Sequence, residues 1–378
     1  MARAGSGAGH LVAPIPLGPE ERLDGPGPWG AFADSAVGSG RREGTLAVRS
    51  RWAPEKCRRT FSLRLRIFAM RLLPLVPLAL LLSGCDADSL SNSSREYEDL
   101  SFDFPLRSGG RITLETYNGS VEVTAWDQEK IEIRGRKHAA TKGLLAEVRV
   151  EANALGPDAV AIRVVPPVPR GNSGAQFTLR VPRRTTVERI VSANGAIRMD
   201  GLEGPGMLRT SNGRIAVGRH QGKLELTTSN GAIDLGSVTG TVIARTANGR
   251  VNVDELTGGL DAATSNGSIA AKLLDAPPEG PLRFSTTNGS VDVRLLRAPR
   301  GDLRVRSSNG AVTLRMPEGS EGRIALSTSN ATIRNEFPLS GSEGISTKTR
   351  VEGKIGNGGP LLDISTTNAT IGLLRSIL

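Results

Sequence analysis

Apolar and polar residues alternate over short stretches from residue 108 onward, and one motif carries most of this alternation. The motif reads apolar, any, Thr or Ser, any, Asn, usually Gly, any, Val or Ile, as in LTTSNGAIDL around Asn230. From Asn194 to Asn330 the successive copies are 18, 18, 18, 18, 22, 21 and 21 residues apart. A fixed period of about 20 residues indicates one supersecondary unit that is repeated. The central asparagines of the copies are Asn118, Asn194, Asn212, Asn230, Asn248, Asn266, Asn288, Asn309, Asn330 and Asn368.

The positions around each asparagine predict two short strands joined by a corner. An apolar residue stands four positions before every one of these asparagines, and Val or Ile stands three positions after it. Five positions after it the residue is again apolar in every copy except one, which has Asn335. Alternation of this kind is typical of a strand with one buried face, and the change of parity at the Asn requires a corner or a bulge. We attribute the Gly that follows most of the asparagines to the positive φ that a corner needs.

The repeat predicts an all-β fold, and specifically a single-chain β-solenoid with coils of 18 to 22 residues. Eighteen residues of strand trace a path of roughly 60 Å, which is a reasonable circuit for one coil. Stacked coils would place inward Asn amides above one another as a hydrogen-bonded ladder. The alternative is a chain of hairpins, because Asn-Gly also favours a type I′ turn with the Asn in solvent. The nearly constant Thr on the apolar face favours the solenoid. The ladder would then be formed by Asn194, Asn212, Asn230, Asn248, Asn266, Asn288, Asn309, Asn330 and Asn368.

The first 84 residues have a different character. Residues 1–69 are rich in Gly, Pro, Ala and Arg without periodicity, and we interpret them as a disordered extension or an over-long start assignment, with Met70 as the favoured start. Residues 70–84, MRLLPLVPLALLLSG, resemble a bacterial lipoprotein signal peptide whose lipobox ends at Cys85. The apolar run is too short for a stable membrane-spanning helix. We therefore expect Cys85 to carry a lipid; the alternative is a signal anchor behind a cytoplasmic extension.

Three further segments follow the signal peptide. Residues 85–107 are polar and irregular, and they predict a tether between the lipid and the folded domain. Residues 108–190 alternate less regularly and form our candidate N-terminal cap, because solenoids need capping at their ends. Residues 191–378 hold the repeats. Between Asn330 and Asn368 the step is 38 residues, which indicates either one decayed copy or an excursion over 331–359.

A lipobox, a strand ending in LRVP, iterated TSNGxIxV units and a final GxGGPxLxISTTNATI together resemble a bacterial family of β-strand-repeat proteins known as putative adhesins. The resemblance covers about residues 108–378. It implies an envelope location and a solenoid-like fold within a domain family of unknown function. It implies neither an established reaction nor agreed catalytic residues.

The composition argues against several functional classes. The chain has 48 basic and 38 acidic residues, and the part before Cys85 holds 12 and 6 of them, which leaves a net charge of +4 for the remainder. The high isoelectric point is therefore weak evidence for nucleic acid, and none is predicted as a partner. His138 and His220 lie far apart and away from acidic pairs, so we predict no metal and no cofactor. His220 is interpreted as an exposed turn residue.

The outward position four residues after each Asn is mixed in charge and is read as a solvated strand face rather than a catalytic groove. A basic stripe suggested by Arg209, Arg245 and Arg306 is interrupted by other residue types. The function predicted is a non-enzymatic, lipid-anchored, extracytoplasmic adhesin-like or scaffold protein of the cell envelope. Its expected partners are the membrane, through the lipid on Cys85, and an envelope protein or wall polymer. The alternatives are a solenoid enzyme acting on envelope polysaccharide and an accessory partner of an envelope-stress sensor.

Overall fold

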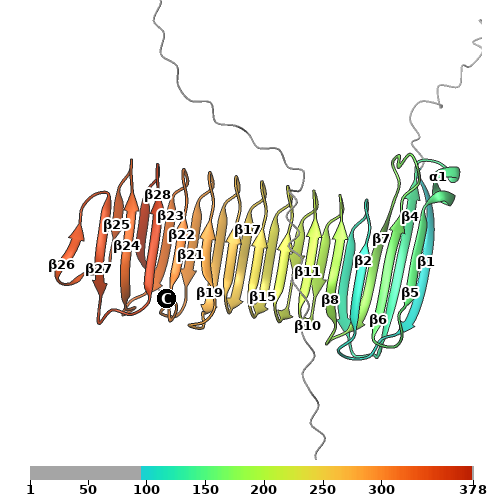
Figure 1. The fold of residues 1–378 in the computed structure, drawn as a ribbon, viewed down its shortest axis with the longest axis horizontal. Helices are drawn as coiled ribbons and strands as arrows, with labels where there is room; N and C mark the ends of the chain where they lie inside the picture. The colour runs from blue at the N-terminus through green and yellow to red at the C-terminus, as the bar shows by residue number, and fades with distance from the viewer. Residues whose placement is uncertain (1–94, 377–378) are drawn as a thin grey trace, which may run out of the picture. The chain divides into compact units, whose positions relative to one another are not determined.

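The computed structural model describes residues 95–376, and within them the chain is all-β, as predicted (Figure 1). The expected extension 1–69, the signal peptide 70–84 and Cys85 lie outside the described residues. The strands form two large mixed sheets, and one short helix, α1 (Lys142–Glu147), lies near the first strands. Thr141 caps this helix by accepting a hydrogen bond from the Leu144 backbone N–H at 3.3 Å.

The first sheet, sheet A, has 15 strands and the second, sheet B, has 14. In spatial order sheet A contains β1 (Glu96–Pro105), β4 (Lys130–Ala139), β7 (Gly174–Pro182), β3 (Val121–Trp126), β9 (Ile197–Asp200), β12 (Ile215–Val217), β15 (Ile233–Thr239), β17 (Val251–Thr257), β19 (Ile269–Asp275), β21 (Val291–Leu295), β23 (Val312–Pro317), β29 (Ile371–Ser376) and β25 (Ile333–Asn335), with β10 (Leu202–Glu203) and β13 (His220–Gln221) off this path. Sheet B contains β26 (Ser340–Ser346), β27 (Arg350–Ile355), β24 (Gly322–Thr328), β28 (Leu361–Thr366), β22 (Leu303–Arg306), β20 (Leu282–Ser285), β18 (Leu260–Ala263), β16 (Val242–Arg245), β14 (Leu224–Thr227), β11 (Gly206–Thr210), β8 (Thr186–Ser192), β2 (Arg111–Glu115), β6 (Ala159–Val165) and β5 (Arg149–Ala154).

Each repeat contributes one layer, which we define as its strand in sheet B, the Asn corner and its strand in sheet A. Consecutive layers pair in parallel with equivalent residues in register. Leu226 pairs with Ala244 in sheet B, and Ile233 pairs with Val251 in sheet A. These side chains are almost completely buried and face the core between the sheets. Burial of a Leu or Ile side chain stabilises a fold by about 1.5–3 kcal/mol, so every layer adds its own share to one continuous core.

The glycine after each Asn is required by close approach and not by its φ angle, so the reason given for it in the sequence analysis is wrong. A Cβ on Gly231 would stand 1.7 Å from the carbonyl oxygen of Gly213 in the preceding layer. Positive φ occurs instead at the opposite corner, where the chain returns from sheet A to sheet B. Gly222, Gly240 and Gly258 have φ of 133°, 135° and 143° there.

Part of the stretch 85–107, predicted as a tether, is a strand instead. Residues 96–105 form β1, which pairs antiparallel with β4 from Glu96 opposite Ala139 to Pro105 opposite Lys130. Within β1 the side chains of Leu100, Phe102 and Phe104 alternate with exposed ones and are half-buried. This alternation lies in a stretch with many acids and serines, so the polar composition concealed a strand with one apolar face.

The spatial order of the layers departs from the sequence order at both ends. At the N-terminal end the layer of β2 and β3 lies between β6–β7 and β8–β9. At the C-terminal end the layer of β28 and β29 lies between β22–β23 and β24–β25. The excursion expected over 331–359 begins only after β25, at residue 336: β27 pairs antiparallel with β24, and β26 pairs with β27 beyond it. Antiparallel strands therefore cover sheet A at its N-terminal end and sheet B at both ends.

Candidate binding face

The repeat asparagines form a continuous side-chain ladder along the Asn corner. The Nδ2 of Asn230 donates to Oδ1 of Asn212 at 2.6 Å, and the Nδ2 of Asn248 donates to Oδ1 of Asn230 at 2.7 Å. The same bond links every neighbouring pair of layers that carry this asparagine. In spatial order the ladder comprises Asn118, Asn194, Asn212, Asn230, Asn248, Asn266, Asn288, Asn309, Asn368 and Asn330.

The ladder is exposed to solvent, so the expectation that these amides point inward is wrong. The change of parity takes place at the Asn-Gly corner, and the inward position falls on the Thr or Ser two residues before the Asn. Thr228, for example, is 3% exposed. An outward Asn is therefore compatible with stacked layers and does not require a hairpin turn.

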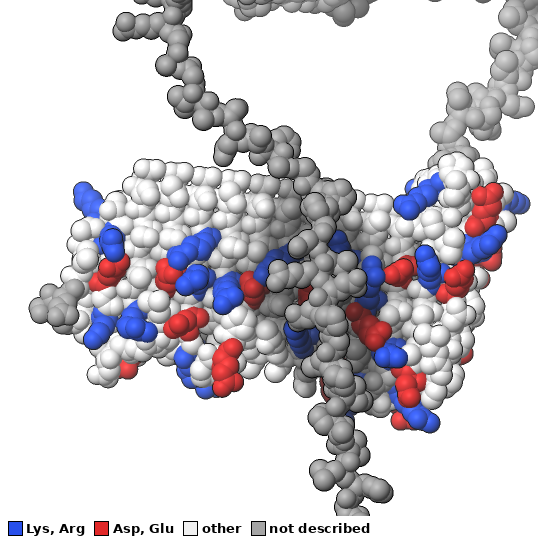
Figure 2. Space-filling view, viewed as in Figure 1, with Lys and Arg blue, Asp and Glu red and all other residues white. Residues whose placement is uncertain are grey.

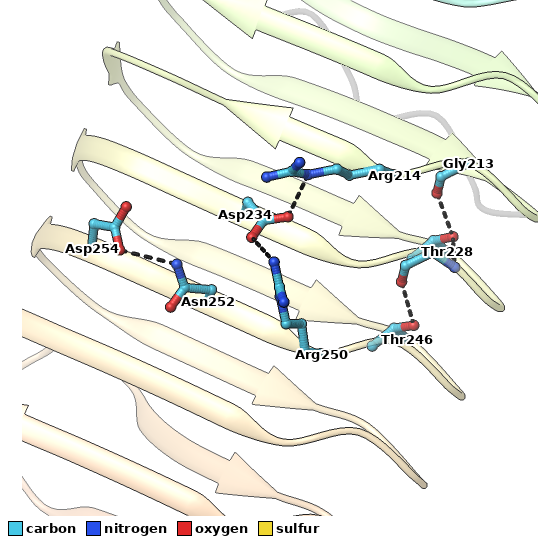
Figure 3. A network of polar contacts seen from close by, with 9 residues as sticks. Gly213, Arg214, Thr228, Asp234, Thr246, Arg250, Asn252 and Asp254 are labelled. Atoms are coloured by element: carbon cyan, nitrogen blue, oxygen red, sulfur yellow. Dashed lines mark hydrogen bonds and ion pairs between the residues drawn. The ribbon is translucent and has the colours of Figure 1, made fainter.

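The buried threonines tie each corner to the preceding layer, a role that the sequence analysis did not assign. The hydroxyl of Thr228 donates to the Gly213 carbonyl at 3.1 Å and accepts from the Gly231 N–H at 3.2 Å. Thr246 repeats both bonds one layer on, and Figure 3 shows Gly213, Thr228 and Thr246 in one row. A buried polar group with both functions paired stabilises a core, whereas an unpaired one destabilises it. The sequence signal was the invariance of Thr or Ser at this apolar-side position.

The outer face of sheet A carries ion pairs that cross from one layer to the next. The Nε of Arg214 lies 2.6 Å from Oδ2 of Asp234, and a guanidinium nitrogen of Arg250 lies 3.7 Å from Oδ1 (Figure 3). The Asp234 side chain is 14% exposed, so it is held among these two arginines near the strand surface. Figure 2 shows the wider arrangement, in which basic and acidic side chains lie side by side in a band across the face in view. Most charged side chains on this surface therefore lie beside a side chain of opposite charge.

A shallow groove crosses this part of sheet A because three small residues stand at outward positions. Ala216, Gly218 and Gly236 leave a hollow of about 420 Å³ in β12, β15 and the turn after β12. We call it the sheet A groove. Its polar walls are formed by Arg198, Asp200, Arg214, Asp234, Arg250, Asn252 and Asp254.

Arg198 is the wall residue whose charge is available to a ligand. Its side chain is exposed, and among the described residues it has no ion pair or hydrogen-bond partner. Its register neighbours are Glu122 in β3 and Ala216 in β12. The Arg219 guanidinium holds the pKa of the nearby Asp200 carboxyl below its usual range, so that acid is ionised at neutral pH. The groove thus offers fixed hydrogen-bond donors and acceptors and one free cation.

A second groove of about 550 Å³ lies where β20, β22 and β28 begin. The repeat steps of 22 and 21 residues produce it, because the added residues form the loops 276–281 and 296–302. Arg283 has no partner among the described residues, whereas Arg304 lies 3.3 Å from Asp363. The lengthened steps are the sequence signal for this groove. Its polar lining comprises Glu279, Arg283, Arg300, Asp302, Arg304 and Asp363.

The suggested basic stripe is not a continuous surface. Arg245 lies 2.5 Å from Asp261, and Arg306 lies 2.5 Å from Asp363, so two of its three members are neutralised. Arg209 is exposed in β11, and among the described residues it has no ion-pair partner.

His220 is buried, so its interpretation as an exposed turn residue is wrong. It is 3% exposed in β13, which pairs with both β10 and β15, and neither ring nitrogen has a hydrogen-bond partner. Burial lowers its pKa to about 4, and burial also lowers the pKa of His138. Across residues 95–376 no three His, Cys, Asp or Glu side chains are grouped as metal ligands would be.

Neither a family model nor a curated protein sequence matches the chain. Residues 95–376 contain no helix long and apolar enough to cross a membrane.

The solved structures that match the chain do so at low sequence identity and low TM-score. A putative adhesin from Parabacteroides distasonis is 10% identical with a TM-score of 0.41, and 73% of this chain and 97% of that chain are covered. A putative adhesin from Bacteroides fragilis is 12% identical with a TM-score of 0.35 and coverages of 73% and 97%. A putative lipid binding protein from Parabacteroides distasonis is 10% identical with a TM-score of 0.33 and coverages of 76% and 98%. The function proposed below rests on the residues of this chain.

Proposed function

We propose that this chain is a non-enzymatic, lipid-anchored, extracytoplasmic protein of the cell envelope that acts as an adhesin-like or scaffold module. In this proposal the repeat region is a β-solenoid, and Cys85 carries the lipid. The observation that supports it best is the outer face of sheet A, where the same outward positions recur in register from β3 to β23. An ordered, repetitive face of this kind suits recognition of an extended partner.

The chemistry of the sheet A groove favours binding. Its arginine and aspartate side chains are mostly held by one another, as in Arg214, Asp234 and Arg250. Such pairs fix the orientation of hydrogen-bonding groups before a ligand arrives, which lowers the entropy cost of association. Arg198 then supplies an attractive charge at the groove wall. We propose that an envelope polymer or envelope protein binds across these layers.

The lipid anchor is compatible with the position of the first strand. Eleven residue positions separate Cys85 from Glu96, the start of β1. A chain of that length spans at most about 40 Å, so the anchor would keep the domain close to the membrane surface.

Two measurements test this function. The full-length protein and its Cys85→Ser variant are expressed in bacteria, and their membrane fractions and N-terminal masses are compared. We expect a diacylglyceryl-modified cysteine and membrane retention that Cys85→Ser abolishes. A membrane-retained Cys85→Ser protein, or an unmodified Cys85, would overturn the anchoring proposal.

For the binding role, the protein is incubated with wall sacculi, membranes and solubilised membrane proteins, and retention and polymer cleavage are both measured. We expect saturable retention without cleavage, weakened by Arg198→Ala. Arg209→Ala is the matched control, because Arg209 is also exposed and has no ion-pair partner among the described residues, but it lies on sheet B. Release of sugar fragments would favour the polysaccharide-enzyme alternative, and equal retention of both variants would exclude the sheet A groove.

A further inference from the structure

The layer formed by β28 and β29, residues 361–376, occupies a gap between two layers that precede it in the sequence. Ile364 pairs with Val305 on one side and Leu326 on the other. Ile371 likewise lies between Val312 and Ile333. We call residues 361–376 the inserted layer. Every strand it pairs with belongs to the body formed by residues 303–335.

The inserted layer is stabilised mainly by its contacts with that body, and few contacts form within the layer. Leu362, Ile364, Ile371 and Leu373 are each 0% exposed between the two flanking layers. On its outer face Asp363 accepts hydrogen bonds from both terminal nitrogens of Arg306. Its asparagine also completes the ladder between the flanking layers. The gap therefore accepts a segment of this sequence wherever that segment comes from.

The connection into the inserted layer has the features of a hinge. Residues 356–360 read GNGGP and join β27 to β28 on the surface. Gly356, Gly358 and Gly359 have φ of 61°, 86° and 143°, in the left-handed region that favours glycine. Glycine takes up an extended conformation as readily as this compact one, so the loop can open at little conformational cost. Fully extended, five residues reach at most about 18 Å, which is enough to cross to an adjacent molecule.

We propose that two copies of this chain exchange their inserted layers, each copy placing residues 361–376 between the β22–β23 and β24–β25 layers of the other. The strand pairs, buried side chains and ladder bonds of the inserted layer would then be reproduced between chains. Only the conformation of residues 356–360 would differ. Domain swapping therefore forms a dimer at little cost in free energy. The resulting dimer presents two sheet A faces, and linked faces bind a repetitive partner with higher avidity than one. The exchange itself does not depend on the proposed function.

Cysteine cross-linking distinguishes exchange from simple association. In a full-length chain with Cys57→Ser and Cys85→Ser, one tagged copy carries Arg306→Cys and a differently tagged copy carries Ser365→Cys. These two positions are register partners on the outer face of sheet B. We expect co-expressed copies to form a covalent heterodimer with a short thiol-reactive cross-linker, and light scattering to show a dimer.

A control pair of cysteines distinguishes exchange from mere proximity of two copies. Arg283→Cys and Arg304→Cys are also register partners on the outer face of sheet B, but they lie in consecutive layers of the same body. Copies that carry them singly should not cross-link to each other, whereas both cysteines in one chain should cross-link within it. Cross-linking between copies in this control pair as well would show mere proximity and would overturn the exchange.

Shortening the hinge gives a second, independent test. Ile355 and Leu361 lie on either side of β24, about two strand spacings or roughly 10 Å apart. Removal of residues 356–359 leaves only Pro360 between them, which spans at most about 8 Å. The chain can then no longer fold back on its own body, so we expect the fraction of dimer to rise at least tenfold over the parent. A shortened variant that remains monomeric with native circular dichroism would overturn the proposal. So would mixed Arg306→Cys and Ser365→Cys copies that never cross-link although the double variant cross-links within one chain. Capture of a different envelope protein by Arg306→Cys would replace the second copy as the occupant of the gap and would overturn the proposal.

Discussion

The hydroxyl of Thr228 donates to the carbonyl of Gly213, 3.1 Å away in the preceding layer and fully inside the corner. The same hydroxyl accepts the N–H of its own Gly231, so one side chain closes a corner and joins two layers. Replacement of Thr228 by Val keeps the shape but leaves both backbone groups unpaired. We expect a loss of about 1–3 kcal/mol in the free energy of unfolding. Urea unfolding followed by circular dichroism measures it.

Thr227→Val is the control for this change, because Thr227 lies one residue earlier on the outer face of the same strand. It should alter the free energy of unfolding by about 0.5 kcal/mol or less, as surface substitutions do. Equal losses for the two variants would show that the buried bonds do not matter.

The close packing at the corner glycines predicts that the exchange of Gly and Ala there affects stability differently in different layers. Gly231→Ala should destabilise the protein by about 1–3 kcal/mol or more, because its Cβ would stand 1.7 Å from the Gly213 carbonyl oxygen. Ala369 occupies the equivalent place in the inserted layer, and its side chain is half-exposed. Ala369→Gly should change the free energy of unfolding by only about 1 kcal/mol. Thermal unfolding of both variants compares them, and a tolerated Gly231→Ala would contradict the close stacking of the corners.

The asparagine ladder predicts that position within the stack matters. Asn230 donates to Asn212 and accepts from Asn248, whereas Asn330 makes a single ladder bond, to Asn368. Asn230→Ala should therefore cost about 1–2 kcal/mol and Asn330→Ala about half as much. Chemical denaturation gives both values. A larger loss of stability for Asn330→Ala than for Asn230→Ala would show that the ladder bonds do not stabilise the fold.

Buried His220 predicts a loss of stability under mildly acidic conditions. Its folded pKa of about 4 lies below the unfolded value near 6.5, so the unfolded state binds more protons between these pH values. Stability therefore falls as pH falls from about 6.5 to 4, by up to about 3 kcal/mol. His220→Leu should flatten this dependence. Unfolding midpoints measured from pH 7 to pH 4 test it.

His138→Leu serves as the comparison for the pH series, because His138 is only half-buried. It should leave more of the slope in place than His220→Leu does. An unchanged slope in the His220 variant would assign the acid sensitivity to the carboxylates instead.

The sheet A groove can be closed without disturbing the strands. A Cβ on Gly236 would meet its nearest neighbour at an ordinary 3.5 Å, so Gly236→Val fills the hollow from an outward position. We expect at least a tenfold loss of retention on the envelope fraction that binds the parent protein, with unchanged unfolding. Thr313→Val on the same face, outside this groove, should retain normal binding. Undiminished retention by Gly236→Val would place the binding surface elsewhere.

Much of the architecture could be predicted from the spacing of a few residue types. Equivalent apolar positions such as Leu226 and Ala244 recur at a constant interval, and a repeated strand with one apolar side buries it only by packing against equivalent strands. The all-β class, the corner at Asn and the pairing of asparagines follow from that requirement. The direction of the Asn side chains did not follow, because the parity change allows the corner residue to face either way.

The order of the layers, the burial of His220 and the two grooves were decided by the tertiary structure. Every layer presents nearly the same edge to its neighbours, so the local pattern around Asn368 is identical whether its layer follows Asn330 or lies between Asn309 and Asn330. Only the route of residues 336–360, which form an antiparallel excursion and then return, selects the inserted position. Arg198 and Gly236 likewise lie in different repeats, and the register of three strands makes them parts of one groove. A repeated sequence therefore determines the kind of contact each layer makes, and the connections between layers determine which layers make it.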